Sequence, residues 1–196
     1  MIPPPTHSGP SFDRPADPTI APSPWVMRWS RLIRPGGSVL DIAAGLGRHS
    51  RALAKAGYTV IAADLDVSGL ADLAGHPRVE IVAVDLEAGK WPFAGRIFDG
   101  VVVTNYLHRP HFLHLIANLA AGGILIIETF GQGNERLGRP RNPDFLLAPG
   151  ELLAAFGPHL QIVAYEHGAE QMPRSAVRQR ICAVKGDGPL YLTEVG

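Results

Sequence analysis

The hydrophobic positions of this chain fall into short, nearly continuous apolar runs separated by polar or glycine-rich segments. Runs of this kind are typical of strands buried on both faces of a parallel sheet. Five of them predict strands at 39–42, 58–63, 79–84, 98–104 and 124–127.

Between most of these runs the apolar spacing changes to a helical period. It predicts helices over 25–33, 49–56, 67–74, 113–121 and 149–156. No helical run separates the third strand from the fourth, so we expect an irregular crossing there. In that crossing, Trp91, Pro92 and Phe93 would cover the edge of the sheet.

The last two apolar segments, 160–165 and 176–184, alternate as strands and are joined only by a polar loop over 168–175. Two strands without a helix between them must pair antiparallel. The pattern therefore predicts an α/β fold: a Rossmann-like, doubly wound, mostly parallel sheet of seven strands with an antiparallel hairpin at its C-terminal end.

Composition limits the domain plan and the partners. The chain has 196 residues, with Lys+Arg and Asp+Glu both at 18, so no net field directs it towards nucleic acid. Residues 1–24 hold eight of the 18 prolines and are expected to form a flexible segment, or a lid over the ligand, ahead of a single domain over 25–196. A single cysteine, Cys182, excludes an internal disulfide framework.

The sequence has no apolar stretch of membrane-spanning length and no basic region followed by an apolar one. We expect a cytoplasmic protein without a membrane partner. The oligomeric state is left open.

The end of the first strand carries the most informative motif. Asp41 is followed by a loop of small residues with Gly45 and Gly47, and a helix begins directly after it. Glycines let backbone approach a ligand, and the helix directs free N–H groups into the same crevice. The third position of a dinucleotide motif is Ser50 here, and a carboxylate before the loop repels a pyrophosphate but suits an ammonium group.

The pattern Asp41-x-x-x-Gly45-x-Gly47, with Asp64 after the second strand and Asp85 after the third, resembles the class I S-adenosylmethionine (SAM)-dependent methyltransferases. Within them, the stretches 105–110 and 128–147 look like those of a small bacterial subgroup similar to tellurite-resistance methyltransferases. The resemblance implies the strand order 3-2-1-4-5-7-6. It also implies SAM as cofactor, S-adenosyl-L-homocysteine as product, and cofactor contacts from Asp41, Ala43, Gly45, Gly47, Asp64, Leu65, Asp85, Leu86 and Asn105.

Asp64 can accept both ribose hydroxyls, as only a carboxylate does readily. Asp66 is the weaker alternative and would cap the following helix. By the resemblance, Asp85 takes the adenine amino group and the N–H of Leu86 meets a ring nitrogen. A simple turn cap is the other interpretation of Asp85.

The fourth and fifth strands deliver ionisable side chains to the same carboxyl edge of the sheet. His108 is the candidate general base, beside Asn105, and Arg139 or Arg109 is the candidate anchor for an anionic acceptor. The loop 131–147 would close over that acceptor. His108, His111 and His114 share a three-residue spacing, but no carboxylate or cysteine completes a metal shell, so no metal is expected.

These features predict a SAM-dependent methyltransferase that acts on a small molecule, which could be anionic, by in-line displacement. The alternatives are an RNA methyltransferase and a SAM-binding module without turnover. An RNA acceptor is favoured by six arginines, at 136, 139, 141, 174, 178 and 180. The balanced charge argues against an extended phosphate-binding surface. The acceptor and the methylated atom are left open.

Overall fold

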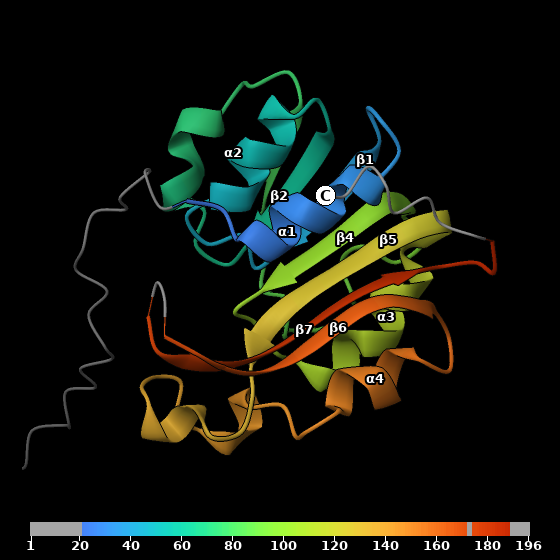
Figure 1. Cartoon of the computed structure of the whole chain (residues 1–196). Helices are drawn as coiled ribbons and strands as arrows, with labels where there is room; N and C mark the ends of the chain where they lie inside the picture. The colour runs from blue at the N-terminus through green and yellow to red at the C-terminus, as the bar shows by residue number, and fades with distance from the viewer. Residues whose placement is uncertain (1–20, 172–173, 189–196) are drawn as a thin grey trace, which may run out of the picture.

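A seven-stranded sheet forms the centre of the molecule, with the order β3-β2-β1-β4-β5-β7-β6 (Figure 1). The computed structural model describes residues 21–171 and 174–188. The strands are β1 Ser38–Ile42, β2 Thr59–Asp64, β3 Val79–Ala83, β4 Phe98–Thr104, β5 Leu119–Phe130, β6 Gln161–Glu170 and β7 Ala176–Val184.

The first five strands pair in parallel, whereas β7 runs antiparallel to both β5 and β6. Both the Rossmann-like fold and the strand order expected from the sequence are confirmed. As a result, β1, β4 and β5 end side by side at one carboxyl edge of the sheet.

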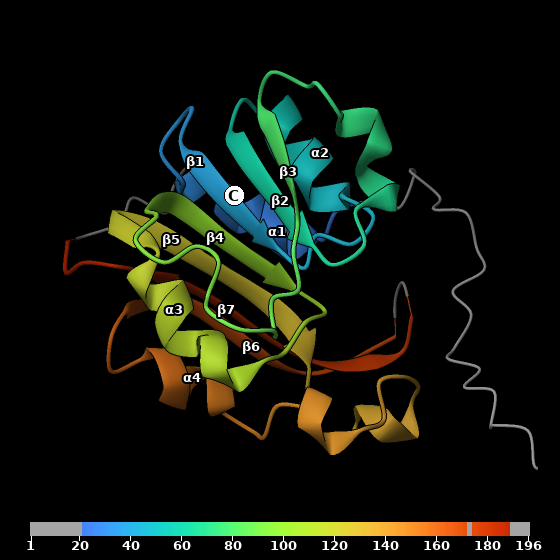
Figure 2. The same cartoon turned by 180° about the vertical axis from the view of Figure 1, so that it is seen from behind.

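Helices cover both faces of the sheet (Figures 1 and 2). One face packs against α1 (Pro24–Trp29) and α2 (Arg48–Lys55), which bury Trp25, Trp29 and Leu53 among the strands. The other packs against α3 (Phe112–Ala117) and α4 (Glu151–Phe156) around Leu115, Leu152 and Phe156.

The crossing from β3 to β4 contains no helix, as expected. Trp91 and Phe93 lie in it and are buried in the core under α3. The Trp91 Nε1–H donates to Asn118 Oδ1 at 2.7 Å, and the Asn118 amide donates at 2.6 Å to the carbonyls of Phe93 and Arg96. One side chain therefore secures this irregular segment.

Three helices predicted from periodicity differ in the structure. The predicted helix 25–33 is α-helical only over Pro24–Trp29 and continues as a 3-10 turn over Ser30–Leu32. The predicted helix 113–121 ends at Ala117, and the chain enters β5 at Leu119, because Asn118 is committed to the crossing and its carbonyl accepts the N–H of Phe98 at 2.8 Å. The predicted helix 67–74 is a 3-10 helix, Ser68–Leu73. The hairpin is longer than predicted, since β6 continues to Glu170.

Residues 1–20 of the proline-rich segment lie outside the described residues. Of its last four residues, Ser23 is buried and Pro24 already begins α1. No helix in the described ranges is long and apolar enough to cross a bilayer. The expected cytoplasmic location stays a prediction.

Candidate active site

The loop between β1 and α2 has a left-handed backbone at three alternate positions: Ala43 (φ 53°), Gly45 (φ 54°) and Gly47 (φ 71°). A Cβ on Gly47 would lie 2.4 Å from Leu70 Cδ2, so glycine is needed there to pack the loop against the 3-10 helix. A Cβ on Gly45 would meet nothing within 4 Å, and Gly45 is exposed. This loop presents open backbone to a ligand on one side and is closely packed on the other.

Asp64, at the end of β2, fastens this loop. Its Oδ2 accepts the N–H of Gly45 at 2.7 Å, and its Oδ1 accepts the N–H of Asp66 at 3.1 Å. A carboxylate has about four acceptor positions, so both oxygens keep one for a ligand hydroxyl. The next side chain, Leu65, is 70% exposed and forms an apolar surface beside the carboxylate.

Asp41 lies beneath the loop rather than on its surface. It is 1% exposed, its Oδ2 accepts the Ser50 hydroxyl at 2.5 Å, and its Oδ1 has no hydrogen-bond partner among the described residues. Burial raises the pKa of Asp41 to about 6, opposed by the Ser50 hydrogen bond. Any effect of this carboxylate on a ligand therefore acts through the loop above it.

Asp85 and Leu86 follow β3 at the same edge. The exposed Asp85 accepts the N–H of Glu87 at 2.9 Å through Oδ1, the turn geometry that the simpler interpretation expected. Leu86 is buried in the core under α3. The turn uses one carboxylate oxygen, so it does not prevent Asp85 from binding a ligand as well.

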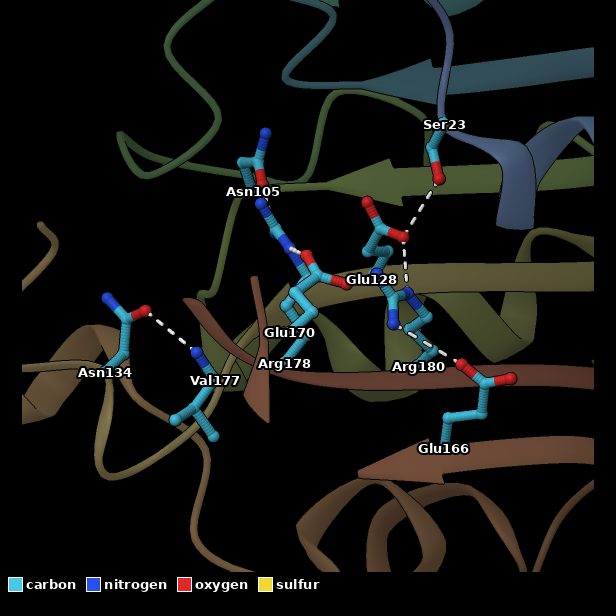
Figure 3. Close-up of polar contacts among 9 residues, drawn as sticks. All are labelled: Ser23, Asn105, Glu128, Asn134, Glu166, Glu170, Val177, Arg178 and Arg180. Carbon is cyan, nitrogen blue, oxygen red and sulfur yellow. Dashed lines mark hydrogen bonds and ion pairs between the residues drawn. The ribbon is translucent and has the colours of Figure 1, made fainter. Parts of the chain in front are cut away.

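At the end of β4, Asn105 is a second non-glycine residue with a left-handed backbone, at φ 55°. Its Oδ1 accepts an Arg178 Nη1–H at 2.8 Å, and Arg178 also pairs with Glu170 at 2.6 Å (Figure 3). A strained position held by an ion-paired arginine is typical of a functional loop.

The predicted base, His108, lies three residues further on and is half-buried. Its Nδ1 is 3.6 Å from Glu87 Oε2, which leaves Nε2 on the other side of the ring. Glu87 is therefore in position to orient the imidazole.

The two candidate anion anchors differ in their surroundings. Arg109 donates to both Glu151 oxygens at 2.6 and 3.0 Å and to the carbonyls of Asp144 and Leu146. It therefore fastens the loop 131–147 to α4, and the expectation that it holds an anion is not supported. Arg139 is exposed on that loop.

A charged network that the sequence patterns did not reveal lies on the α1/α2 face of the edge. Glu128, 4% exposed, accepts through Oε2 from Arg180 Nε at 2.6 Å and from the Ser23 hydroxyl at 2.9 Å (Figure 3). Arg180 also pairs with Glu166 at 3.3 Å and with Glu170. The Glu128–Arg180 contact follows from their pairing across β5 and β7, and a charge in an apolar strand was its only signal in the sequence.

Arg48 is a further residue that the sequence did not single out. It occupies the first position of α2, and burial lowers its pKa. Within the described residues it donates to the carbonyl of Ala21 at 3.3 Å, and no carboxylate there lies within ion-pair distance. A partly buried cation beside the glycine loop can hold an anionic group.

We expect Arg180→Met to destabilise the fold by about 3 kcal/mol, because it leaves Glu128 buried without its cation. Urea unfolding would measure the change. Arg136→Met is the matched control: its side chain is 85% exposed and its pair with Glu135 spans 3.7 Å, so we expect under about 0.5 kcal/mol. Equal effects of the two substitutions would contradict a structural role for the network.

Comparisons with known proteins agree with this architecture. Residues 39–122 match the family described as "Methyltransferase domain". The chain is 36% identical over 117 residues to a demethylmenaquinone methyltransferase of Clavibacter sepedonicus, covering 54% of this chain and 47% of that protein. A protein of the same name from Mycobacterium marinum is 43% identical over 72 residues, 37% of this chain and 30% of its own. The chain thus spans about a third to a half of the length of these curated relatives.

Solved structures show the same fold at low identity. TehB from Haemophilus influenzae superposes with a TM-score of 0.68 at 19% identity, covering 82% of this chain and 61% of its own. A 1,6-didemethyltoxoflavin-N1-methyltransferase of Burkholderia thailandensis, solved with 1,6-didemethyltoxoflavin and S-adenosylhomocysteine, gives 0.61 at 22% identity, with coverages of 84% and 77%.

The fold is that of the class I methyltransferases. The matched segment includes the glycine loop, Asp64 and Asp85, and it confirms the resemblance to the SAM-dependent members of this class that the sequence motifs indicated.

Proposed function

We propose that this chain is a SAM-dependent methyltransferase that acts on a small-molecule acceptor. The observation that carries the proposal is the left-handed glycine loop at the end of β1, joined by the Gly45 N–H to Asp64 at the end of β2. The segment that matches the methyltransferase family contains both. The neighbour solved with S-adenosylhomocysteine supports SAM as the cofactor.

The residues at this edge fit an adenosyl group. In this proposal the free acceptor positions of Asp64 take the ribose hydroxyls, and the exposed Leu65 and the buried Leu86 enclose the adenine. Asp85 accepts from the adenine amino group, and the N–H of Leu86 donates to a ring nitrogen. Open space above Gly45 admits the chain that follows the ribose.

The amino acid end of the cofactor fits the other end of the loop. Arg48 would hold its carboxylate, because this guanidinium lacks an ion-pair partner in the described part of the chain and lies at the N-terminus of α2. Ala43, Gly47 and the strained Asn105 would shape the backbone on either side. Asp41 would bias the site towards the ammonium group through the loop.

When bound, SAM supplies a methyl carbon on a sulfonium sulfur, and on transfer the C–S electron pair stays with sulfur while the acceptor gives up a proton. His108 would take that proton on Nε2 while Glu87 holds Nδ1. Asn105 would position the acceptor. The rest of the rate would come from alignment, which needs no further catalytic group.

The names of the relatives and neighbours support a small-molecule acceptor, since they include a demethylmenaquinone and a didemethyltoxoflavin methyltransferase. That Arg139 anchors an anionic acceptor stays a prediction, as do the RNA and non-catalytic alternatives.

Two measurements test the proposal. Isothermal calorimetry should show micromolar binding of S-adenosylhomocysteine, and binding of NAD in its place would overturn the cofactor assignment. A panel of thiol, hydroxyl, amine, carboxyl, metalloid-oxyanion and RNA acceptors, assayed with SAM, should then show turnover on a small molecule. Cofactor binding without turnover on any of them would favour the non-catalytic module.

His108→Ala should lower kcat on such an acceptor about 100-fold, the usual range for loss of a general base. Its affinity for S-adenosylhomocysteine should stay within twofold, because His108 does not line the cofactor loop. Arg139→Ala should raise KM for an anionic acceptor only. His159→Ala, an exposed histidine beyond α4, is the control for His108, and unchanged turnover in His108→Ala would remove it as the base.

A further inference from the structure

The side chain of Asn105 lies at the edge of the sheet where methyl transfer is proposed to take place. β4 pairs with β1 as far as Val103 and Ile42, and Asn105 follows two residues later, beside the glycine loop that continues from Ile42. Its backbone N–H donates to the carbonyl of Glu128 in β5 at 2.8 Å. Asn105 therefore lies between the loop proposed to bind the cofactor and the end of β5.

One contact determines which end of the Asn105 amide is offered to a ligand. Its Oδ1 accepts from Arg178 Nη1 at 2.8 Å. A guanidinium group has donors only, so the oxygen of the amide turns towards Arg178 and the nitrogen turns away from it. In Figure 3 the amide nitrogen of Asn105 points away from Arg178.

The guanidinium group of Arg178 is itself held in place. Its Nε donates to Glu170 Oε1 at 2.6 Å, and its central carbon lies 4.5 Å from the centroid of the Phe130 ring. Turning the Asn105 amide over would direct its N–H bonds at those of Arg178. Arg178 cannot move aside without breaking both the ion pair and the ring contact. The fold therefore fixes the orientation of the amide.

The free end of this amide is a hydrogen-bond donor. Asn105 is exposed, and no group of the described residues accepts from its Nδ2. The amide nitrogen carries two N–H bonds and accepts none. A ligand at this edge therefore meets a donor at Asn105.

A donor in this position distinguishes between nucleophilic atoms. An amine nitrogen has one lone pair, which must point at the methyl carbon during transfer, so an N–H bond from Asn105 would compete for it. A hydroxyl oxygen has two lone pairs, of which one can accept from Asn105 while the other attacks. A thiol sulfur is a weak acceptor and gains less from the same contact.

We propose that this enzyme methylates a hydroxyl oxygen and discriminates against amines, with Arg178 as the positioning residue that fixes the Asn105 donor. The proposal rests on the function proposed above and adds the reacting atom to it. On transfer the oxygen forms a bond to the methyl carbon, and the C–S bond breaks with its electron pair staying on sulfur. The hydroxyl proton passes to His108 Nε2.

Sinefungin tests the orientation of the amide without a known acceptor. This cofactor analogue has an ammonium group, which can only donate, where SAM has the transferable methyl group. Calorimetry on the full chain gives the ratio of its dissociation constant to that of S-adenosylhomocysteine. Arg178→Met frees the amide to turn its oxygen towards the ammonium group, so this ratio should fall about tenfold, as expected for one charge-assisted hydrogen bond. An unchanged ratio would overturn the proposal.

The loss of a positive charge alone also favours an ammonium group, and a double-mutant cycle separates the two causes. Asn105→Gly removes the amide and suits the left-handed backbone at φ 55°. In the Asn105→Gly background, Arg178→Met should change the ratio by less than about twofold, because no amide is left to turn. An equal fall in both backgrounds would show that Arg178 acts only through its charge, contrary to the proposal.

Asn105→Gly on its own leaves the Glu170 ion pair of Arg178 in place and gives an independent result. It should not raise the ratio, since the parent amide offers the ammonium group no acceptor. A rise of about fivefold or more would mean that the amide oxygen already faces the ligand, and the proposal would be wrong. Arg136→Met, whose side chain is 85% exposed, is the matched control for Arg178→Met and should keep the parent ratio.

The acceptor panel tests the reacting atom directly. Any acceptor that turns over should carry the new methyl group on oxygen, as mass spectrometry and NMR of the product would show. Methylation of an amine nitrogen would contradict the proposal. If the parent protein fails to bind S-adenosylhomocysteine, the proposed function itself falls. If it binds this product and the ratio does not respond to Arg178→Met, only the assignment of the reacting atom falls.

Discussion

Asp64→Asn should weaken binding of S-adenosylhomocysteine about 100-fold, or about 2.7 kcal/mol. Hydrogen bonds to a charged group contribute about 1.5–3 kcal/mol each, and the carboxylate is proposed to accept two ribose hydroxyls. It also holds the Gly45 N–H at 2.7 Å, so an amide in its place loosens the glycine loop that the cofactor follows. Isothermal calorimetry measures the affinity directly.

Asp66→Asn is the control for this substitution. It lies two residues away, is exposed, and accepts the Ser68 N–H at 2.9 Å, a bond that asparagine can also make. We expect its affinity to stay within twofold of the parent. Should Asp64→Asn bind S-adenosylhomocysteine within threefold of the parent, Asp64 does not hold the ribose.

The second large effect concerns two adjacent titrations under the same loop. Burial raises the pKa of Asp41 to about 6 and lowers the pKa of His49 to about 3. Neutral His49 accepts the Ser23 N–H through Nε2 at 3.1 Å and faces Thr104 and Arg48, whereas Asp41 faces Ser50, Arg48 and Asp64. Folding therefore favours the uncharged form of both side chains.

The two contributions to stability have opposite signs between pH 4 and 6. The folded protein holds the Asp41 proton more tightly than the unfolded chain does, so this contribution is present below pH 3.8 and lost as the pH rises through 6. The His49 contribution is present above pH 6.5 and lost as the pH falls towards 3. Each changes by about 1.4 kcal/mol per pH unit, and they offset each other.

Asp41→Asn removes one of the two contributions. Relative to the parent, its free energy of unfolding should fall by about 3 kcal/mol as the pH drops from 6 to 4, because nothing then offsets the destabilisation that comes from His49. The free energy of unfolding of His49→Gln should rise by about 3 kcal/mol relative to the parent over the same pH interval. Urea unfolding at several pH values measures both, and the remaining carboxylates cancel in the comparison. Parallel pH profiles for the three proteins would show that neither group titrates with a shifted pKa.

The strands were predicted within a few residues at most ends because they are buried on both faces, and continuous apolar runs such as 98–104 have few other interpretations. Helix ends were less predictable. The end of α3 depends on Asn118, whose side chain bonds to carbonyls more than 20 residues earlier in the chain. A local pattern carries no information about such a contact.

The candidate site divides in the same way. The glycine loop, Asp64 and Asp85 could be proposed from the sequence because short spacings carry them, and each lies at the expected strand end. Whether each charged side chain has a partner of opposite charge could not be predicted from the sequence. From the sequence, Arg109 is as good a candidate anion anchor as Arg139, but in the structure it pairs with Glu151. Arg48 resembles any other helix residue in the sequence, and only the structure shows that it has no carboxylate partner among the described residues.

The position of β7 between β5 and β6 has a consequence for the order of folding. One edge of β5 pairs with β4 and the other with β7, and Glu128 meets Arg180 52 residues later in the chain. Contacts so far apart in sequence close late, since loop-closure entropy must first be overcome. During synthesis on the ribosome we therefore expect the edge of β5 and the carboxylate of Glu128 to stay exposed until β7 emerges, which leaves this strand edge open to aggregation in that interval.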